Sequence, residues 1–331
     1  MRDEESTPSQ LSLGKLSVSL AVSVGLLWFV FRSVDFGLLI ERLQTLQPMM
    51  VLGAFFTIAG FQMLRAWRFA YLVRPLAPND QATLVRIGHL GMFLMMFMPL
   101  RLGEFARPYL MQRKLGVALS SGLGAAALER TLDGLCVALL FFLGIASLDS
   151  SIVVPELLKN AGWMTLALFG GILLGIVGSL VAQPQVKAAL SFCLRPFPQA
   201  LRDKVFMLHQ GIMDGFKTLP DLKSASVVIG VTLVIWVMNA LVFYLVLKAF
   251  GWSLGFETGV LLACILVLVI MIPAGPGFLG TYQAALTLGL SLWGVSETDA
   301  AAYGLVVYPL TVLVVSSFGA YGFWSSGRTG A

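Results

Sequence analysis

Charged residues follow an apolar run at short spacing in residues 97–114, which read FMPLRLGEFARPYLMQRK. Glu104 and Arg107 are three positions apart, so both lie on one face of a helix that continues through them. The guanidinium of Arg101 or Arg107 can bind two phosphate oxygens at once, and a carboxylate can hold a guanidinium in place. The spacing predicts either a charged pocket for a polar headgroup or an interfacial turn whose arginines contact lipid phosphates.

A second charged group, Glu129-Arg130-x-x-Asp133, lies inside a long apolar segment. Glu129 and Asp133 are four positions apart and share one helical face. Each charge inside a membrane costs ~2.5–3.5 kcal/mol on insertion scales, so it needs a partner or a cavity. Arg101 or Arg107 is the expected partner. The group is either part of a binding pocket or a structural cluster of ion pairs.

A third segment, residues 273–283, reads PAGPGFLGTYQ. Its prolines remove backbone donors and its glycines free the backbone, which predicts a break between two helices. The amides that begin the following helix can bind an anion such as phosphate. A plain tight connection is the alternative, and the P-loop is excluded because its Lys-Ser/Thr pair is absent. Four residues of this segment join the candidate substrate site: Gly275, Gly277, Gly280 and Gln283.

The segment Leu64-Arg65-Ala66-Trp67-Arg68 lies near the end of a predicted membrane span. Arginine and tryptophan at the end of a span usually anchor it at the membrane surface. We expect this anchoring role for Arg65 and Arg68, and a role in function is the alternative.

The remaining reactive residue types predict no catalytic or metal site. His89 and His209 are isolated in the sequence, as are Cys136, Cys193 and Cys264, so we expect neither a zinc site nor a disulfide framework. No Ser-His-Asp set is recognisable. We therefore expect no cofactor and a transporter rather than an enzyme.

These motifs lie in a chain whose composition is that of a polytopic membrane protein. Hydrophobic residues make up 58% and charged residues 12% of the 331 residues, whereas soluble domains have about 25% charged residues. The mean hydropathy is +0.87. We predict one all-α transmembrane domain over 1–331, with six to eight spans and one or two broken or re-entrant helical hairpins. A polar stretch, 1–13, precedes the clear spans at 14–32, 48–73, 119–148, 161–182, 225–249 and 300–324.

The basic residues predict the orientation of the chain in the inner membrane of a bacterium. The 183–224 loop is rich in Lys and Arg and is expected in the cytoplasm, whereas the acidic 149–160 loop is expected outside. Both flanks of residues 84–118 are then cytoplasmic, which predicts a re-entrant hairpin. Residues 258–293 have external flanks and form either two short spans or a second such hairpin. Both chain termini are expected in the cytoplasm, and the two halves form an inverted repeat, a pattern that points to a transporter's binding site.

One cytoplasmic segment, 185–222, has an amphipathic pattern. Between Leu201 and Leu219, apolar residues recur at helical spacing and charged residues occupy the other face. This helix is expected to lie either on the membrane surface or on the protein's own cytoplasmic face.

The motifs resemble those of the lysylphosphatidylglycerol synthase transmembrane-region family, whose members are also described as flippase-like. The resemblance is carried by LRAWRFAYL, PLRLGEFARPYLMQRKLG, ALERTLDGL and IPAGPGFLGTYQAAL, and it covers nearly the whole chain. The chain departs from the family pattern at Met95, where asparagine is frequent, and at Gln283, where glutamate is frequent. The family's charged and glycine positions correspond here to Arg101, Glu104, Arg107, Glu129, Arg130, Asp133, Gly277 and Gly280.

The resemblance implies a lipid-handling function. Members fused to a soluble aminoacyl-transferase domain make and move aminoacylated phosphatidylglycerol, and we expect this chain to lack that synthase part. The first hypothesis is a translocase that moves an anionic or amphiphilic lipid between leaflets, with the lipid headgroup bound by the charged residues. The alternatives are a membrane-embedded transferase and an accessory subunit in glycolipid, polyprenyl-lipid or hopanoid metabolism. A second copy of the chain or an envelope-pathway enzyme remains open as a partner, whereas the net charge of +5 is assigned to loops and not to nucleic-acid binding.

Overall fold

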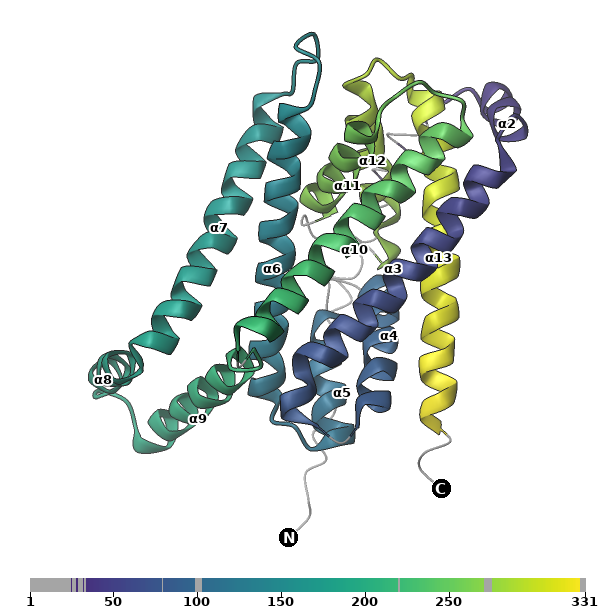
Figure 1. Ribbon diagram of the computed structural model, residues 1–331. Coiled ribbons are helices and arrows are strands. Elements are labelled where there is room, and N and C mark those ends of the chain that lie inside the picture. Colours follow the sequence, from purple (N-terminus) through teal and green to yellow (C-terminus); the bar gives the residue numbers. More distant parts are fainter. Residues whose placement is uncertain are drawn as a thin grey trace.

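The computed structural model describes residues 25, 28, 32, 34–78, 80–98, 103–219, 221–270 and 276–327. Within these ranges the chain forms helices and short connections and contains no strand, which confirms the all-α prediction (Figure 1). Several predicted features lie outside these ranges, wholly or for the most part: the stretch 1–13, the span 14–32, Pro99, Arg101, Pro273 and Gly275.

Among the described residues, four helices are long and apolar enough to cross a membrane. A fifth, α6, is as long as these but carries Glu129, Arg130 and Asp133 near its middle. All five lie within a few residues of the predicted spans, because each coincides with a long apolar run. They are α3 (Pro48–Val73, followed by the short η1, Arg74–Leu76), α6 (Leu119–Ala146), α7 (Glu156–Val181), α10 (Leu222–Ala249) and α13 (Glu297–Gly327).

Shorter helices form two hairpins. In the first, α4 (Gln81–Phe97) packs against α5 (Ala106–Leu115); in the second, α11 (Phe256–Ile270) packs against α12 (Leu279–Ser291), which follows the short turn η3 (Pro276–Phe278). At a rise of about 1.5 Å per residue, α4 and α11 are each shorter than the ~30 Å hydrocarbon core.

Chain connectivity places the two hairpins in opposite directions. Short connections join α4 to the end of α3 and α5 to the start of α6, whereas α11 follows the end of α10 and α12 precedes the start of α13. The first hairpin therefore opens at one end of the bundle and the second at the other end (Figure 1). Which end faces the cytoplasm stays a prediction.

Local sequence explains where these helices begin and how tightly the first hairpin closes. The Asp221 carboxylate accepts a hydrogen bond from the backbone N–H of Ser224 at 2.6 Å and so begins α10. The same bond holds the pKa of Asp221 below its usual range. Gly103 is required for close packing, because a Cβ at this position would collide with the backbone of Leu94 and Met95.

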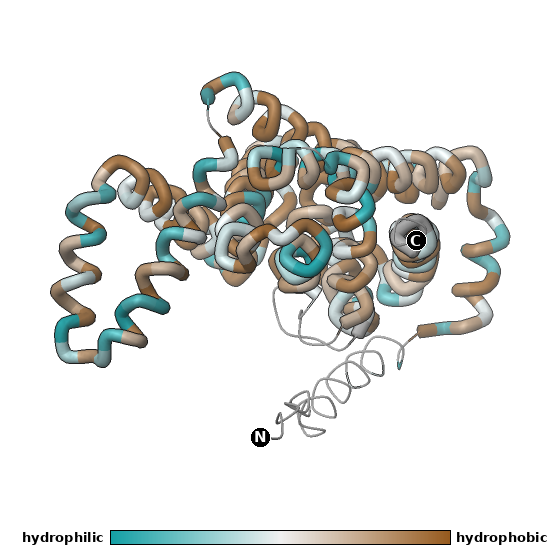
Figure 2. The backbone as a smooth tube through the Cα atoms, turned by 90° about the horizontal axis from the view of Figure 1, so that it is seen from below, coloured by the Kyte–Doolittle hydropathy of each residue, from teal (hydrophilic) through white to brown (hydrophobic). Residues whose placement is uncertain are grey.

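An arm of two helices, α8 (Gln183–Cys193) and α9 (Gln199–Phe216), corresponds to the predicted amphipathic segment. The C-terminal half of α9 packs closely on α6 through Gly211 and Gly215. By contrast, α8 has no buried residue, and Met207 in α9 is 72% exposed. Figure 2 shows the arm projecting sideways from the bundle. The end of α9 thus lies on the protein's own surface, and contact of α8 with a membrane stays a prediction.

The helices α3 and α10 run antiparallel, side by side (Figure 1). Near one end the backbone N–H of Gln47 donates to the carbonyl oxygen of Ala249 at 2.9 Å. Farther along, Arg68 in α3 donates to the Thr232 hydroxyl in α10 at 2.7 Å. Because of this register, the residues of α3 and α10 that form the site described below lie opposite each other.

Labelling of single cysteines tests the orientation of the first hairpin. In a variant without the three native cysteines, Gln81→Cys and Lys114→Cys mark its two open ends, and Ser150→Cys marks the other end of the bundle. Because both flanks of the hairpin are basic, we expect a membrane-impermeant thiol reagent to label the first two from the cytoplasmic side and the third from outside. Labelling of positions 81 and 114 from opposite sides would contradict the hairpin topology.

Candidate functional site

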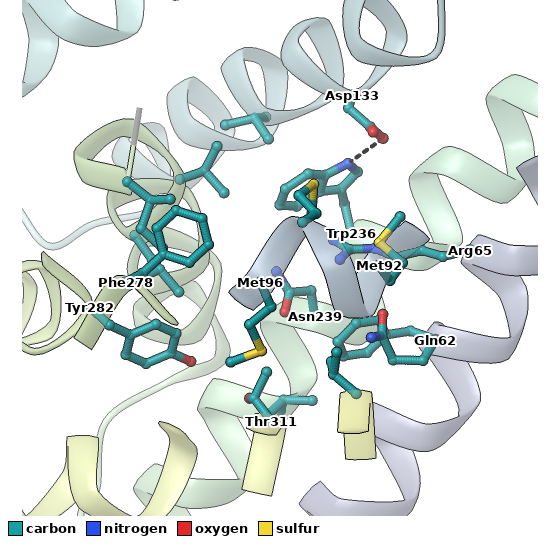
Figure 3. A pocket seen from close by; sticks show the side chains of 18 of the residues that line it. Gln62, Arg65, Met92, Met96, Asp133, Trp236, Asn239, Phe278, Tyr282 and Thr311 are labelled. Atoms are coloured by element: carbon teal, nitrogen blue, oxygen red, sulfur yellow. Dashed lines mark hydrogen bonds between the residues drawn. The ribbon is translucent and has the colours of Figure 1, made fainter. Parts of the chain in front are cut away.

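A cavity of about 400 Å³ lies where the two hairpins meet. The helices α3, α6, α10 and α13 surround it, and the ends of α4 and α11, the turn η3, the start of α12 and part of α7 also contribute to its wall (Figure 3). Most of the wall is apolar and includes Met92, Met96, Phe278 and Tyr282. Four charged residues also line the cavity: Arg65, Glu104, Arg130 and Asp133.

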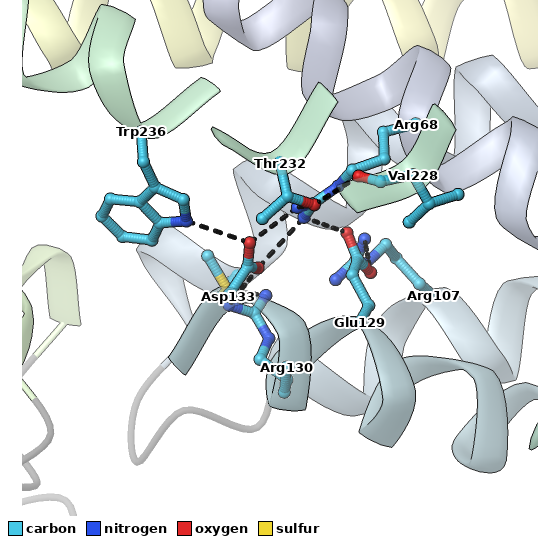
Figure 4. A network of polar contacts seen from close by, with 9 residues as sticks. Arg68, Arg107, Glu129, Arg130, Asp133, Val228, Thr232 and Trp236 are labelled. Carbon is cyan, nitrogen blue, oxygen red and sulfur yellow. Dashed lines mark hydrogen bonds and ion pairs between the residues drawn. The ribbon is translucent and has the colours of Figure 1, made fainter. Parts of the chain in front are cut away.

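Behind the cavity wall, Arg68 binds both carboxylates of α6 (Figure 4). Its Nη1 lies 2.6 Å from Oδ1 of Asp133, and its Nη2 lies 3.0 Å from Oδ2, which is a bidentate contact. The same Nη2 donates to Oε1 of Glu129 at 2.8 Å. The Arg68 side chain is 1% exposed, so this pairing takes place away from solvent.

Each carboxylate has a further partner. The indole N–H of Trp236 donates to Oδ1 of Asp133 at 3.1 Å. Arg107 forms an ion pair with Glu129, with its Nη1 2.8 Å from Oε2, and its guanidinium lies over the Phe69 ring. Four helices, α3, α5, α6 and α10, thus contribute to one buried polar network. Because every buried charge in it has an opposite charge nearby, the network reduces the cost of placing these groups at membrane depth.

Two arginines of the cavity wall have weaker partners. The guanidinium of Arg65 lies over the rings of Phe61 and Trp236, 5.1 and 5.7 Å from their centroids, and none of the described carboxylates lies within ion-pair distance of it. Arg130 is 3.9 Å from Oδ2 of Asp133, and its other terminal nitrogen is 3.4 Å from the sulfur of Met95. The Arg130 side chain is 32% exposed. Both guanidiniums can therefore accept an anion from the cavity.

The pattern of a family described as lysylphosphatidylglycerol synthase TM region matches residues 16–319. The chain belongs to this family. A curated relative, the UPF0104 membrane protein MJ1078 of Methanocaldococcus jannaschii, is 24% identical over 235 residues, which are 70% of this chain and 94% of that protein. No solved structure matches the chain. With its apolar helices and this family membership, the protein is an integral membrane protein.

The residues predicted from the family motifs fall into three groups. Glu104, Arg130, Asp133 and Gly277 line the cavity. Glu129 and Arg107 lie behind it in the buried network, where Arg107 is one partner of Glu129, as expected. The remaining predicted residues do not line the cavity or are not described: Gly280 and Gln283 are buried outside its wall, and Arg101 and Gly275 lie outside the described ranges.

The glycine segment reaches the cavity through its turn. Gly277 has a φ of +75°, a conformation that favours glycine, and its carbonyl oxygen accepts a hydrogen bond from Tyr308 at 2.8 Å. Phe278, which follows, begins α12 and lines the cavity. Anion binding by the first amides of α12 stays a prediction.

The anchoring role expected for Arg65 and Arg68 is wrong. Arg68 is buried and Arg65 lines the cavity, whereas Trp67, on another face of α3, is 43% exposed. The sequence contained a signal for this arrangement: Gln62, Arg65 and Arg68 recur every three residues and therefore share one face of α3. A polar face that begins about three turns before the helix end is unlike an anchor at the membrane surface.

Replacement of Arg68 tests the buried network. Arg68→Met leaves Asp133 and Glu129 with fewer positive partners, so we expect the free energy of unfolding to fall by about 3–5 kcal/mol. The control is Arg74→Met at the end of the same helix, where the guanidinium lies over the Tyr71 ring and about 1 kcal/mol is expected. Unfolding in mixed micelles measures both, and equal losses for the two variants would show that the network does not stabilise the fold.

Proposed function

We propose that this protein is a lipid translocase that moves a phosphate-bearing lipid between the leaflets of the cytoplasmic membrane. The observation that carries the proposal is the pair Arg65 and Arg130, which face one cavity: none of the described carboxylates lies within ion-pair distance of Arg65, and the nearest one to Arg130, that of Asp133, is 3.9 Å away. A guanidinium binds phosphate oxygens in pairs, so the two side chains together can hold a headgroup phosphate. Trp236 places its ring beside Arg65 and leaves the donors of the guanidinium free for a ligand.

The charge balance supports a singly charged anion. Among the described residues, the cavity and the network behind it contain four arginines and three carboxylates. Among these described residues, positive charges therefore exceed negative charges by one. A phosphodiester is a monoanion at neutral pH, so its binding would bring the site to neutrality. Neutrality favours transfer through the membrane interior, where an uncompensated charge is expensive.

The arrangement of the hairpins supports translocation over simple binding. Transporters place their substrate sites near the membrane midplane, between broken helices of two oppositely oriented halves. Here two hairpins that open at opposite ends meet at the cavity. We propose that the headgroup enters between them while the acyl chains stay in the bilayer. The family description, which refers to the membrane region of a lipid synthase, is consistent with a lipid substrate.

The basic residues support an orientation with both termini in the cytoplasm. Lys187, Arg195, Arg202 and Lys204 lie in the α8–α9 arm, at the end of the bundle where α13 also ends (Figure 1). Basic loops remain on the cytoplasmic side during insertion. The first hairpin would then open to the cytoplasm and the second to the outside.

Conservative replacement of the cavity arginines tests the proposal. Arg65→Lys and Arg130→Lys keep the charge but lose the planar fork that binds two oxygens. Since a charge-assisted hydrogen bond contributes about 1.5–3 kcal/mol, we expect leaflet-resolved transport of phosphatidylglycerol in proteoliposomes to fall roughly tenfold or more.

The matched control is Arg113→Lys at the exposed end of α5, which should keep wild-type transport. All three variants should remain monodisperse after purification. Wild-type transport by the two cavity variants would exclude these arginines as the phosphate site.

A further inference from the structure

Several uncharged polar side chains line the same cavity, and three of them come from the long helices around it: Gln62 in α3, Asn239 in α10 and Thr311 in α13 (Figure 3). Gln62 is 4% exposed, and its Oε1 has no hydrogen-bond partner among the described residues. The Thr311 hydroxyl donates to the carbonyl oxygen of Val307 and lies within hydrogen-bond reach of the Tyr282 hydroxyl, which leaves it one further acceptor position. A buried polar atom without a partner costs about 1–3 kcal/mol, so a ligand that pairs with Gln62 recovers this energy.

The position of these residues follows from the antiparallel register of α3 and α10. Arg65 lies beside Trp236. Gln62 precedes Arg65 by three residues, and Asn239 follows Trp236 by three residues, so each lies one helical turn farther from the charged network. One such step is about 4.5 Å along the helix axis, which is the scale of a small headgroup. A ligand whose phosphate contacts Arg65 can therefore extend its next group toward Gln62 and Asn239.

We infer that Gln62, Asn239 and Thr311 form a hydroxyl-binding subsite beside the phosphate-binding arginines. The lipid headgroup is then a phosphodiester of an uncharged polyol, such as glycerol or a sugar alcohol. This inference rests on the proposed function, because it assumes that Arg65 and Arg130 hold the phosphate.

The chemistry of the subsite selects a hydroxyl over charged groups. A side-chain amide donates and accepts, and a hydroxyl does both in return. An ammonium only donates, and near Gln62 it would lie one turn from the Arg65 guanidinium, whose like charge repels it at low dielectric. A phosphodiester with an additional carboxylate would exceed the single surplus positive charge of the described site residues. Headgroups that carry an amine are therefore disfavoured here.

Binding of short-chain lipids to the purified full-length protein in micelles tests the inference. Dioctanoyl phosphatidylglycerol and phosphatidylinositol carry hydroxyl groups beyond the phosphodiester, phosphatidylethanol carries none, and phosphatidylethanolamine carries an ammonium. We expect the wild-type protein to bind one or both polyol lipids at least about fivefold more tightly than phosphatidylethanol, the gain from one or two hydrogen bonds. Tighter binding of phosphatidylglycerol would indicate a subsite for glycerol, whereas tighter binding of phosphatidylinositol would indicate a subsite for a ring polyol.

Gln62→Leu and Asn239→Leu should each reduce this preference toward equal binding while binding of phosphatidylethanol changes less than about twofold, which also shows that the variants fold. The matched control is Gln283→Leu. Gln283 is buried and its Oε1 also lacks a partner among the described residues, but it does not line the cavity, so the preference should remain.

Two contrary results are distinguishable. Equal binding of all phosphodiesters by the wild-type protein, or the same loss in Gln283→Leu as in Gln62→Leu, overturns the hydroxyl subsite. In that case, weaker binding of every phosphodiester by Arg130→Gln would still support the proposed phosphate site. If Arg130→Gln changes none of them, the proposed function fails, and the subsite fails with it.

Discussion

The buried guanidinium of Arg68 is the interaction on which the rest of the site depends. It is held between Asp133 and Glu129, both on α6, and also donates to Thr232 on α10. Without a cation at this point, two carboxylates would lie one turn apart in the interior of a membrane protein, where neither hydration nor distance reduces their repulsion. Arg68 therefore fixes α3 against α6 and α10, and Glu129 extends the connection to Arg107 on α5.

Arg68 contacts both carboxylate oxygens of Asp133. The guanidiniums of the cavity wall can therefore bind other partners. Along the helix axes, the pairs of residues that face each other on α3 and α10 change from ionic to neutral polar to apolar. Arg68 and Thr232 form an ionic level, Arg65 and Trp236 a cationic one, and Gln62 and Asn239 a neutral polar one. Ile58 and Phe243, one turn beyond, are apolar. The cationic level, which would bind a headgroup phosphate, is thus adjacent to the neutral polar level, which would bind headgroup hydroxyl groups.

Much of the fold could be predicted from the sequence, because long apolar runs determine the helices. The pairing of charges could not. A sequence shows which residues share a helical face, but Arg68 and Asp133 are 65 positions apart, and only packing brings them together. The basic residues at the end of α3 were misinterpreted for this reason, since a surface anchor and a buried partner use the same residue type. Gln283 is the opposite case. Its position in the glycine motif predicted a place in the substrate site, but the side chain packs against Gly304 and does not line the cavity.

The order of apolar and charged residues after α4 follows from the same geometry. The last turns of α4 contribute Met92, Met95 and Met96 to the cavity wall, and the helix ends at Phe97. A helix that continued through this point would fill the space between α6 and α13. Because the chain turns back instead, with Gly103 packed against Leu94, the next residues reach two different sides of one wall: Glu104 lines the cavity and Arg107 binds Glu129 behind it. The break in the helix and the charges that follow it thus belong to one arrangement, a mostly apolar cavity with a few charged side chains in its wall.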